Sequence, residues 1–337
     1  MSGGEALGDV PGLAASLTIM CVLAVILNSI VIVVFATKAQ SFTSVHLFIM
    51  NLCISDIFLA GIALPVRLDN GSHEGESFKG GDPVCKMIMF IPLLSISSSI
   101  STMVAIAVDR FREIIKRHKL LSKQAMYVIM VSWVWSVVVS SPQLYEYSVY
   151  SNYDEEYNVT SCGSHDIVEN FETVYAVIVI VLSYVVPLIL ITISYVKIMI
   201  FVWKTGKNVA GKESQVLKKR MKIVRLLITI TVVFALLWSP YFALFGMEEI
   251  LGLDDTLHTE SGTHVTKNVL VVLSTMSNPV IYFVFDAKFR KDLLQLLTRK
   301  PCGQLHVNQV QPSTDVINEL RNKLNTASTT VESFETD

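Results

Sequence analysis

Long apolar stretches, separated by short polar segments, follow one another along most of the chain. Seven of them reach the length of about 20 residues that a helix needs to cross the hydrocarbon core of a bilayer. They begin near Leu13, Val45, Val84, Ala125, Val174, Val224 and His264. Because continuous apolar runs of this length are typical of transmembrane helices, the pattern predicts a chain that crosses a membrane seven times.

Some of these runs carry polar residues in their interior. The third contains Ser97, Ser98 and Ser99, and the seventh contains Asn278. Such side chains face protein or a water-filled cavity rather than lipid, so the helices are expected to pack together. The composition agrees, because 52% of the residues are hydrophobic and 17% are charged. The expected fold class is an all-α membrane protein, a seven-transmembrane helix bundle.

The chain divides into three expected regions. Residues 1–12 are an N-terminus too short and too acidic for a signal peptide, so the first apolar run is expected to act as its own insertion signal. Residues 13–300 form the bundle together with a short amphipathic eighth helix at Ala287–Leu297. Residues 301–337 form a polar tail that is expected to be disordered. The Ser- and Thr-rich end of this tail is either a phosphorylation patch or a solvated linker.

The basic residues are distributed unevenly between the segments that join the runs. With the N-terminus outside, most of them fall on the inner side, at Lys38 and within 110–123, 204–225 and 288–300. Since cytoplasmic loops carry an excess of Lys and Arg, we expect a multi-pass plasma-membrane protein with an extracellular N-terminus. The basic residues expected near the outer face are Arg67, Lys79, Lys86 and Lys267.

Three residues are candidates for covalent modification. Asn70 and Asn158 begin N-x-S/T sequons in segments expected outside the cell, so both are candidate glycosylation sites. Cys302 follows the amphipathic stretch after the seventh run. It is either a palmitoylated cysteine beside an interfacial helix or a free thiol in the tail.

The other four cysteines fall into two pairs. Cys21 and Cys53 lie inside apolar runs and are interpreted as small core residues. Cys85 opens the third run on the outer side, and Cys162 lies in the second outer loop. Both face an oxidising compartment, so a disulfide that ties this loop to the head of the third helix is expected.

Each run also carries a characteristic residue or short motif, in an order that matches a known family. In chain order these are Asn28; Leu52 and Asp56; Cys85 and Asp109-Arg110-Phe111; Trp133 and Pro142; Pro187 and Tyr195; Phe234, Trp238 and Pro240; and Asn278-Pro279-Val280-Ile281-Tyr282. With these markers the chain resembles a rhodopsin-like (class A) G-protein-coupled receptor, from the first run to the amphipathic stretch. One marker alone is weak, whereas seven in order leave little room for chance.

Asp56 is an ionisable residue deep in an apolar run, and such residues mark functional sites. The resemblance implies that Asp56, Ser99 and Asn278 help to form a pocket for water and a sodium ion, which favours the resting state. It places three more residues in the same activation region: Asn28, Trp238 and Pro279. An allosteric sodium ion at Asp56 is the one metal considered, and no other cofactor is expected.

The stretch VAIAVDRFREIIK, residues 104–116, ends an apolar run with Asp109 and Arg110. The resemblance implies that Arg110 is restrained at rest and is released to contact a G protein. It assigns the same switch to Phe111, Tyr195 and Tyr282. Many relatives carry a second restraining acid at the base of the sixth helix, where this chain has Arg220. We therefore expect Asp109 to be the chief restraint and basal activity to be appreciable.

The same resemblance implies the partners of the chain. They are an extracellular ligand, a heterotrimeric G protein that is activated when the sixth helix moves outward, arrestin and receptor kinases at the tail, and membrane lipid. Basic residues beside the third and sixth runs either hold the G protein or meet anionic lipid. No nucleic-acid partner is expected.

Exclusions narrow the class of ligand. The resemblance places a Schiff-base lysine at position 272 in retinal pigments and an aspartate at position 92 in amine receptors, but this chain has Val272 and Pro92. Acidic and aromatic residues near the outer end of the sixth run suit a basic, partly aromatic ligand. The candidate pocket residues are Arg67, Pro92, Gln143, Tyr241, Phe242, Phe245, Glu249 and Asn268.

Within the family, the motifs CKM at 85–87 and VAIAVDRFR at 104–112 are most similar to those of neuropeptide receptors. Receptors of the RFamide type (neuropeptide FF-like) are nearest, with neuropeptide Y-like and orexin-like receptors close by. In those relatives an acid at the position of Glu249 meets a ligand arginine, and a glutamine at the position of Pro92 contacts the amidated end. This chain keeps the acid and lacks the glutamine, so a peptide ligand is expected and the RFamide type is left open.

Two other classes of function were weighed. A transporter is expected to show repeated halves with broken helices, and the runs share no such repeat. An enzyme needs a nucleophile with a base or a cluster of metal ligands, and none of the seven histidines has such a partner at i+4 within a run. We expect no enzyme, and the alternative that remains is a receptor of this fold that is constitutively active without a peptide agonist.

Overall fold

A computed structural model of the chain describes residues 11–37, 43–65, 78, 80–153, 158–164, 170–206, 212–251 and 260–298. Its helices are α1 (Pro11–Ala36), α2 (Ser44–Phe58), η3 (Leu59–Ala63), α4 (Gly81–Ile115), α5 (Ser122–Ser140), α6 (Gln143–Glu146), α7 (Phe171–Ile180), η4 (Val181–Val185), α8 (Val186–Gly206), α9 (Lys212–Leu251), α10 (Glu260–Phe285) and α11 (Ala287–Leu297). Two strands, β1 (Tyr147–Tyr153) and β2 (Asn158–Ser164), lie between α6 and α7.

Seven spans in the described residues are long and apolar enough to cross a membrane, which confirms the predicted fold class. They are Ala15–Ala36, Ser44–Ala63, Gly81–Ile115, Ser122–Glu146, Phe171–Thr205, Met221–Met247 and Val265–Phe285. Two spans continue through the π-helical segments η3 and η4. The segment η4 ends two residues before Pro187, whose missing N–H removes one hydrogen bond of the regular helix.

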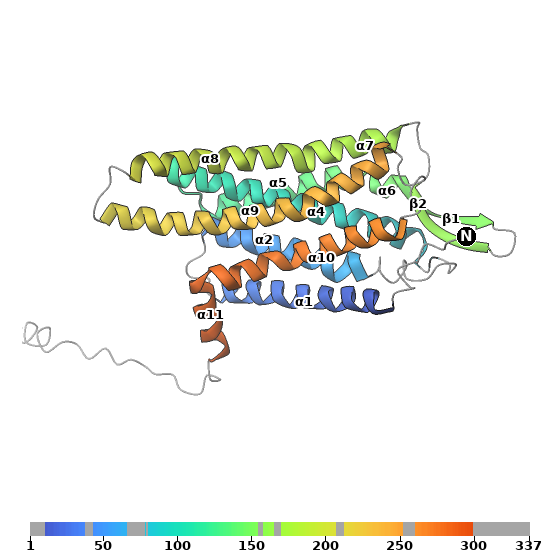
Figure 1. Cartoon of the computed structure of the whole chain (residues 1–337), viewed down its shortest axis with the longest axis horizontal. Coiled ribbons are helices and arrows are strands. Elements are labelled where there is room, and N and C mark those ends of the chain that lie inside the picture. Colours follow the sequence, from blue (N-terminus) through green and yellow to red (C-terminus); the bar gives the residue numbers. More distant parts are fainter. Residues whose placement is uncertain are drawn as a thin grey trace, which may run out of the picture. The chain divides into compact units, whose positions relative to one another are not determined.

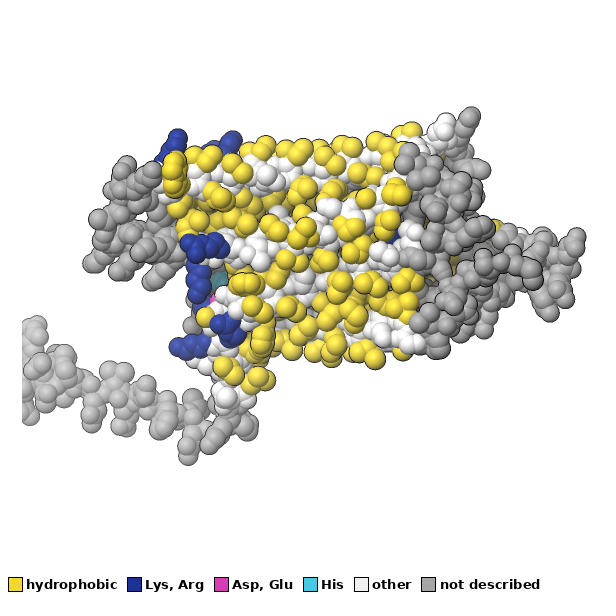
Figure 2. Space-filling view, viewed as in Figure 1, with side chains coloured by type: hydrophobic (Ala, Val, Ile, Leu, Met, Phe, Trp, Pro, Cys, Tyr) yellow, Lys and Arg dark blue, Asp and Glu magenta, His cyan; other side chains and the backbone are white. Residues whose placement is uncertain are grey.

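The helix α4 lies at the centre of the bundle and packs against α2, α5 and α8 (Figure 1). The helix α1 packs on α2 and α10, and α9 packs on α7 and α10. Large apolar side chains such as Val134, Trp203 and Leu236 point away from these contacts and are 65%, 66% and 68% exposed. Figure 2 shows apolar side chains over the middle of one face and basic side chains at one end. This is the surface of a bundle that has lipid as its solvent.

Polar side chains inside the bundle bond to one another across helices. The Asn51 amide of α2 donates to the Thr102 hydroxyl of α4 at 2.8 Å, and the Trp133 indole of α5 donates to the Asn51 carbonyl at 2.8 Å. The Ser55 hydroxyl donates to Ser98 at 3.0 Å. These bonds confirm that the polar residues of the runs face protein, where hydrogen bonds offset the cost of burial.

Strands β1 and β2 form an antiparallel hairpin in which Val149 lies opposite Cys162. Cys162 is bonded to Cys85 near the start of α4, which confirms the predicted disulfide. The Val149 N–H also donates to the Asp82 carboxylate at 2.7 Å, so two connections hold the hairpin over α4. We call this end of the bundle the hairpin end, and the opposite end, which carries Arg110, the Arg110 end.

One residue, Asp286, separates the end of α10 from the start of α11. The Asp286 carboxylate accepts the backbone N–H groups of Lys288 and Phe289 at 2.9 and 3.2 Å, which caps the new helix. The Phe289 ring is buried against Phe35 and Phe283. The predicted eighth helix is therefore present with the expected bounds.

Several residues considered above lie outside the described part of the chain. They are Lys38, Arg67, Asn70, Lys79, Cys302, the segment 1–10 and the segment 299–337. Three candidate residues have a described backbone in α9 or β2 but no described side chain: Asn158, Arg220 and Glu249.

Candidate functional site

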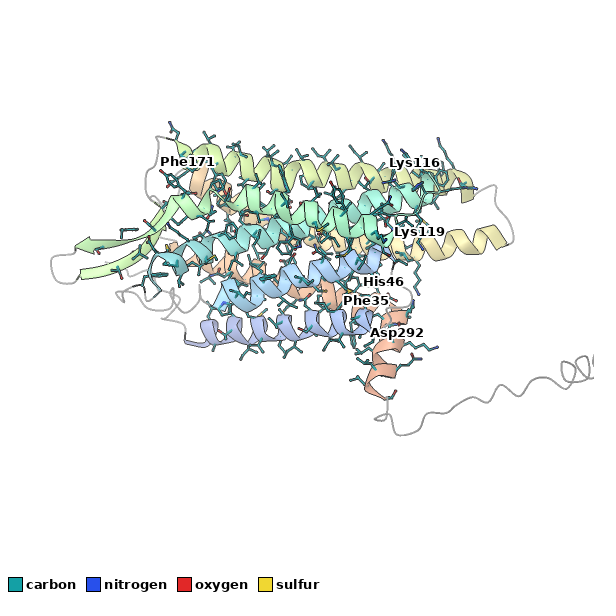
Figure 3. The ribbon with its side chains drawn as sticks, turned by 180° about the vertical axis from the view of Figure 1, so that it is seen from behind. Phe35, His46, Lys116, Lys119, Phe171 and Asp292 are labelled. Carbon is teal, nitrogen blue, oxygen red and sulfur yellow. A yellow bond between two sulfur atoms is a disulfide. The ribbon has the colours of Figure 1, made fainter. Side chains whose placement is uncertain are left out.

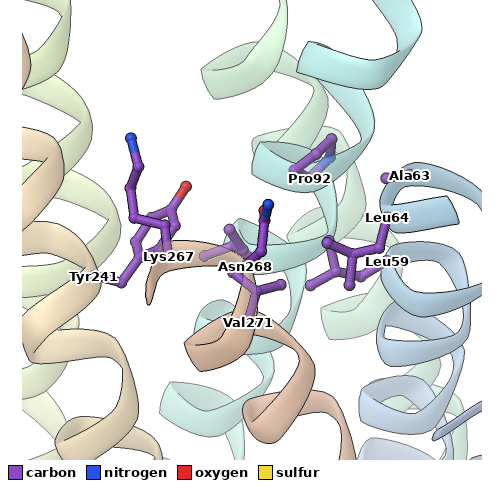
Figure 4. A pocket seen from close by; sticks show the side chains of 9 residues that line it. Leu59, Ala63, Leu64, Pro92, Tyr241, Lys267, Asn268 and Val271 are labelled. Atoms are coloured by element: carbon purple, nitrogen blue, oxygen red, sulfur yellow. The ribbon is translucent and has the colours of Figure 1, made fainter. Parts of the chain in front are cut away.

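A small pocket opens between four helices in the hairpin half of the bundle (Figure 4). Its lining is Leu59, Ala63, Leu64, Pro92, Ile96, Tyr241, Lys267, Asn268 and Val271. Three of the predicted ligand residues, Pro92, Tyr241 and Asn268, therefore meet in one place although they come from three different helices. The cavity volume is about 20 Å³, which is on the scale of one water molecule.

Lys267 is the residue of this pocket that the sequence analysis missed. It was expected near the outer face, and in the structure it is the third residue of the seventh span, Val265–Phe285, and is 7% exposed. A lysine within an apolar span is costly unless it faces the bundle interior and has a function. The free-energy cost of burying this charge could have pointed to Lys267 as a pocket residue. It was overlooked because Lys267 was counted as a residue flanking the membrane.

The remaining aromatic candidates on α9 lie next to this pocket rather than in its lining. Phe242 is buried, stacks on Tyr184 with ring centroids 4.7 Å apart and also contacts Trp238. Phe245 and Gln143 are half-buried, and neither belongs to the lining of the pocket.

A chain of aromatic rings leads from the pocket into the core. Tyr241, in the pocket lining, meets the Trp238 ring edge-on at 5.0 Å, and Trp238 contacts Phe234 at 5.7 Å. The Tyr184 hydroxyl, from the fifth span, is hydrogen-bonded to Ser239 on α9. Tyr241 also contacts Phe242, which stacks on Tyr184, so ring contacts connect this pocket residue to the fifth span.

The polar core contains the predicted sodium-pocket residues. The Asn278 amide donates to the Asp56 carboxylate at 3.0 Å, so these two residues are brought together as expected. The Asn28 amide donates to the carbonyls of Ala24 and Thr275, both at 2.9 Å. Ser99 is buried on α4 and is not a partner in these bonds. Pro279 lies inside α10 directly after Asn278.

Oxygen atoms suited to a small cation are present in this core. Asp56 is 5% exposed and carries a carboxylate, and Ser99 is 6% exposed and carries a hydroxyl. The Asn28 side-chain oxygen is buried and has no hydrogen-bond partner among the described residues. Hard cations prefer oxygen ligands of these kinds, so the residues present fit a sodium ion. Among the described residues no group of three His, Cys, Asp or Glu side chains forms a metal site.

At the opposite end, the Arg110 guanidinium is sequestered by carboxylates. It pairs with Asp109, and it also pairs with Glu113, three residues further along α4. The Ser44 hydroxyl of α2 donates to Asp109 at 2.9 Å, which fixes this carboxylate to a second helix. Arg110 keeps only 8% of its side chain exposed.

Glu113 is a second carboxylate beside Arg110 that the sequence analysis did not name. Arg110 pairs with Asp109, the expected partner, and with Glu113 as well. Residues three apart lie on the same face of a helix, so the spacing of Arg110 and Glu113 was a usable signal. It was missed because the search was confined to the base of the sixth helix, where Arg220 stands.

The other predicted switch residues, Phe111, Tyr195 and Tyr282, lie on α4, α8 and α10. Phe111 is half-buried, and the Lys197 ammonium of α8 lies 5.9 Å from its ring centroid. Tyr195 and Tyr282 are both buried. The Tyr282 hydroxyl has no hydrogen-bond partner within the described part of the chain, and its ring contacts Phe35 edge-on.

Exposed basic side chains gather beyond Arg110. They include Lys116, Arg117, Lys119, Lys123, Lys204, Lys222 and Arg225. Figure 3 shows Lys116 and Lys119 at the end of the bundle away from Phe171. This end can attract an anionic surface or an acidic partner segment.

Comparison with known proteins agrees with this arrangement. A family model described as "7 transmembrane receptor (rhodopsin family)" matches residues 27–282. The chain is 27% identical to a QRFP-like peptide receptor of Branchiostoma floridae, with 88% of this chain and 78% of that one covered. It is 26% identical to neuropeptide FF receptor 2 of Mus musculus (85% and 73% covered) and 26% identical to the pyroglutamylated RF-amide peptide receptor of Mus musculus (79% and 65% covered).

The match of the family model extends from Leu27 in α1 to Tyr282 in α10, so it includes the small pocket, the polar core and the residues around Arg110. The predicted resemblance, including its nearest group of relatives, is confirmed. The chain belongs to the rhodopsin family of seven-transmembrane receptors.

Proposed function

We propose that this protein is a plasma-membrane receptor that binds an extracellular peptide at the hairpin end and activates a heterotrimeric G protein at the Arg110 end. The N-terminus is extracellular, and activation moves the Arg110 end of α9 outward. The peptide class is supported by the relatives, which are named as receptors of RF-amide-type and other neuropeptides. The orientation is supported by the basic residues that gather at the Arg110 end.

The observation that carries this proposal is the sequestered Arg110. A guanidinium has five donors and cannot lose its charge, so it is stable inside the bundle only while Asp109 and Glu113 pair with it. When Arg110 leaves these carboxylates and contacts a G protein instead, the bundle changes from a closed to an open arrangement. Such a two-state element is what a ligand can bias from a distance.

The aromatic chain on α9 is the proposed route from ligand to Arg110. A ligand group that enters the pocket contacts Tyr241, which touches Trp238. Pro240 lies inside α9 between Trp238 and Tyr241, and a proline within a helix permits a bend because one backbone hydrogen bond is missing. Repacking of Trp238 would therefore shift the Arg110 end of α9 relative to α4.

Two features of the core favour distinct resting and active states. The buried Tyr282 hydroxyl lacks a partner among the described residues, and an unsatisfied buried hydroxyl costs about 1–3 kcal/mol. A rearrangement that gives it a partner recovers this free energy. In the resting state, a sodium ion held by the oxygens of Asp56 and Ser99 would oppose that rearrangement, because it neutralises the buried carboxylate.

The modifications and regulatory partners expected from the sequence are part of this proposal. Asn158 lies at the start of β2, at the hairpin end, which is compatible with glycosylation outside the cell. Glycosylation at Asn70, palmitoylation at Cys302, and binding of arrestin and receptor kinases to residues 301–337 rest on the sequence alone.

A peptide screen in transfected cells tests the proposal. The receptor is expressed together with a G-protein activation reporter, and a neuropeptide library is applied in parallel to cells that express the Arg110→Ala variant at equal surface density. The expected result is a saturable, concentration-dependent response of the unmodified receptor. Arg110→Ala is expected to bind the same peptide and to lose the response.

Three results would contradict the proposal in different ways. Silence toward every peptide, together with high basal signalling, would favour the constitutive alternative. Binding without G-protein activation would retain the ligand class and overturn the coupling. An unchanged response of Arg110→Ala would show that the buried guanidinium is not part of the switch.

A further inference from the structure

A groove lies between the fourth and fifth spans, on the outside of the bundle and apart from the small pocket described above. One wall is α5, with Trp135, Val138, Val139 and Pro142, and the other wall is α7 with the start of η4. The helix α5 packs against α4 and α2, whereas α7 packs against α9. The volume between the two walls is about 310 Å³, which is the size of a small-molecule site.

The groove begins at the hairpin end of the two spans and runs toward the middle of the membrane. Phe171 is the first residue of α7 and of the fifth span, and Figure 3 shows it at the end of the bundle away from Lys116. From Phe171 to Leu182 this wall extends about 16 Å. Val138 and Ile178, one from each wall, are 59% and 47% exposed. Since both helices span the membrane, the groove opens to lipid.

Two backbone carbonyls near the end of α5 are bonded by side chains. Pro142 has no N–H, which leaves the Val138 carbonyl without its helical partner, and the Ser141 hydroxyl donates to this carbonyl at 2.9 Å. The Tyr175 hydroxyl reaches from α7 to α5 and donates to the Val139 carbonyl at 2.8 Å. Because these groups are satisfied by the protein, the groove suits an occupant whose body is apolar.

The lining favours an occupant that is flat and rigid. The rings of Phe171 and Tyr175 are stacked, with centroids 6.0 Å apart and planes inclined by 14°. Val138, Val139 and Ile178 are β-branched and therefore stiff at χ1. A flexible acyl chain loses conformational freedom when it is fixed between such walls, whereas a rigid ring system loses little. Sterols are the rigid, flat apolar lipids in which the plasma membrane is rich.

We propose that the groove between α5 and α7 is a binding site for a membrane sterol. The ring system of the sterol lies between the two walls, and its hydroxyl lies at the membrane surface on the hairpin end, where water can bond to it. This site goes beyond the proposed function, because it takes a ligand from the lipid and lies outside the bundle.

The bound sterol also acts on the sixth span through η4. Leu182 lines the groove and belongs to η4, and π-helical segments are frequent at functional sites. Tyr184, in the same segment, is hydrogen-bonded to Ser239 of α9 and stacks on Phe242 at 4.7 Å. The groove is present in the arrangement in which Arg110 is paired with carboxylates, so the sterol stabilises the resting state. This effect on signalling rests on the proposed function, whereas the binding itself does not.

Photolabelling of the purified full-length receptor tests the site. The receptor is placed in phosphatidylcholine nanodiscs that contain photoreactive cholesterol, and labelled peptides are identified by mass spectrometry with and without excess cholesterol. The variants Val138→Trp and Ile178→Trp fill the groove from opposite walls. Their chain neighbours give the matched controls Val137→Trp and Val177→Trp, which are 46% and 42% exposed and do not line the groove.

The unmodified receptor is expected to be labelled on α5, α7 and η4, and excess cholesterol is expected to remove this label. Val138→Trp and Ile178→Trp should lower the labelling about tenfold, because the added ring occupies the space of the ligand. Val137→Trp and Val177→Trp should leave it unchanged. Since the two groove-filling variants lie on different helices, poor folding of one leaves the other as a test.

The effect on signalling is measured in cells as ligand-free G-protein activation before and after cyclodextrin removes membrane sterol. Removal is expected to raise this activation in the unmodified receptor and in Val177→Trp, because the resting state loses a ligand. Ile178→Trp should show no such rise. Since both variants share the same membrane, a general effect of sterol on the bilayer would change them equally.

Each other outcome overturns a defined statement. Equal labelling of groove-filling and control variants would overturn the site. Labelling by photoreactive phosphatidylcholine that cholesterol does not displace would identify an acyl chain and overturn the sterol, and cross-links between two receptor copies at the groove would assign it to a dimer contact. The expected labelling with equal responses of Ile178→Trp and Val177→Trp to cyclodextrin would retain the site and overturn its effect on the resting state. If the receptor activates no G protein under any condition, the proposed function fails and the labelling result still decides the site.

Discussion

Glu113 is expected to hold the receptor in its resting state together with Asp109, and its removal should raise signalling in the absence of ligand. The variant Glu113→Ala deletes one of the two carboxylates that pair with Arg110. Alanine is the residue most favourable to a helix, so α4 itself is retained. The remaining partner, Asp109, is still fixed by the Ser44 hydroxyl.

The size of the effect follows from the contact that is lost. A hydrogen bond to a charged group contributes about 1.5–3 kcal/mol. The Asp109 carboxylate is 1% exposed and accepts such a bond from Arg110, so we assign it the upper end of this range. Glu113 is 17% exposed and forms an ion pair with Arg110, while its Oε2 atom has no hydrogen-bond partner among the described residues, so we assign it the lower end. If about 1% of the receptors are active at rest, a loss of about 1.5 kcal/mol raises the active fraction to about 10%, and a loss of about 3 kcal/mol raises it to about 60%.

The assay is ligand-free G-protein activation in cells, measured over a range of receptor densities and normalised to surface expression. Glu113→Ala is expected to increase the basal slope about tenfold, and Asp109→Ala is expected to increase it further. Glu172→Ala, which removes a half-buried carboxylate at the hairpin end of the bundle, serves as the control and should leave the slope unchanged.

Two results would refute this reasoning. A basal slope that rises in Asp109→Ala but not in Glu113→Ala would mean that the Glu113 pair is equally strong in both states and restrains nothing, because only a difference between states shifts a population. Unchanged slopes in both variants would show that these ion pairs do not control activation.

Three further predictions concern the hairpin, the polar core and the bundle interior. Cys85→Ala or Cys162→Ala removes a disulfide that links residues 77 positions apart. The purified variant is expected to lose up to about 4 kcal/mol of unfolding free energy. Its thermal-unfolding midpoint should therefore be lower, and added reductant should not lower it further. Agonist binding to the unmodified receptor is expected to weaken when sodium replaces potassium in the buffer, and Asp56→Asn should abolish this dependence. If Asp56→Asn shows the same sodium effect, no cation is bound at this carboxylate. Asn51→Leu leaves the Trp133 indole without an acceptor and also removes the bond to Thr102, whose hydroxyl still donates to the Ser98 carbonyl. The change is expected to cost about 1–3 kcal/mol for the indole and to lower thermal stability more than Trp133→Phe, where only one bond is lost.

The number and placement of the membrane spans could be read from the chain because the bilayer imposes its own length. A run of about 20 apolar residues has few stable environments other than a membrane. Each predicted start therefore lies within three residues of the first residue of the observed span. The Cys85–Cys162 disulfide followed from the same topology, since only these two cysteines were placed on the outer side. The local pair Asp109–Arg110 was visible because the residues are adjacent.

Other contacts depend on how the helices are rotated about their axes. Polar residues such as Asn278 indicate which face of the seventh span meets protein, but the sequence does not show which neighbouring helices that face contacts. The packing of α10 against α9 turns Lys267 and Asn268 toward Pro92 and Tyr241. The amide of Asn51 similarly joins α2, α4 and α5, three helices whose register along one another is set by side-chain packing.

The amino-acid sequence therefore specified the architecture, the family and the two ends of the molecule, because hydrophobic length, charge bias and short motifs act locally along the chain. The fold assigned the second carboxylate at Arg110, the ring contacts from Tyr241 to Phe234 and the lysine in the pocket. The Arg110–Glu113 pair and the rings from Tyr241 to Phe234 each lie within one helix, α4 or α9, and their contacts depend on side-chain conformations that packing selects. The pocket depends on packing more strongly, because it joins side chains of separate helices that no single stretch of the chain contains.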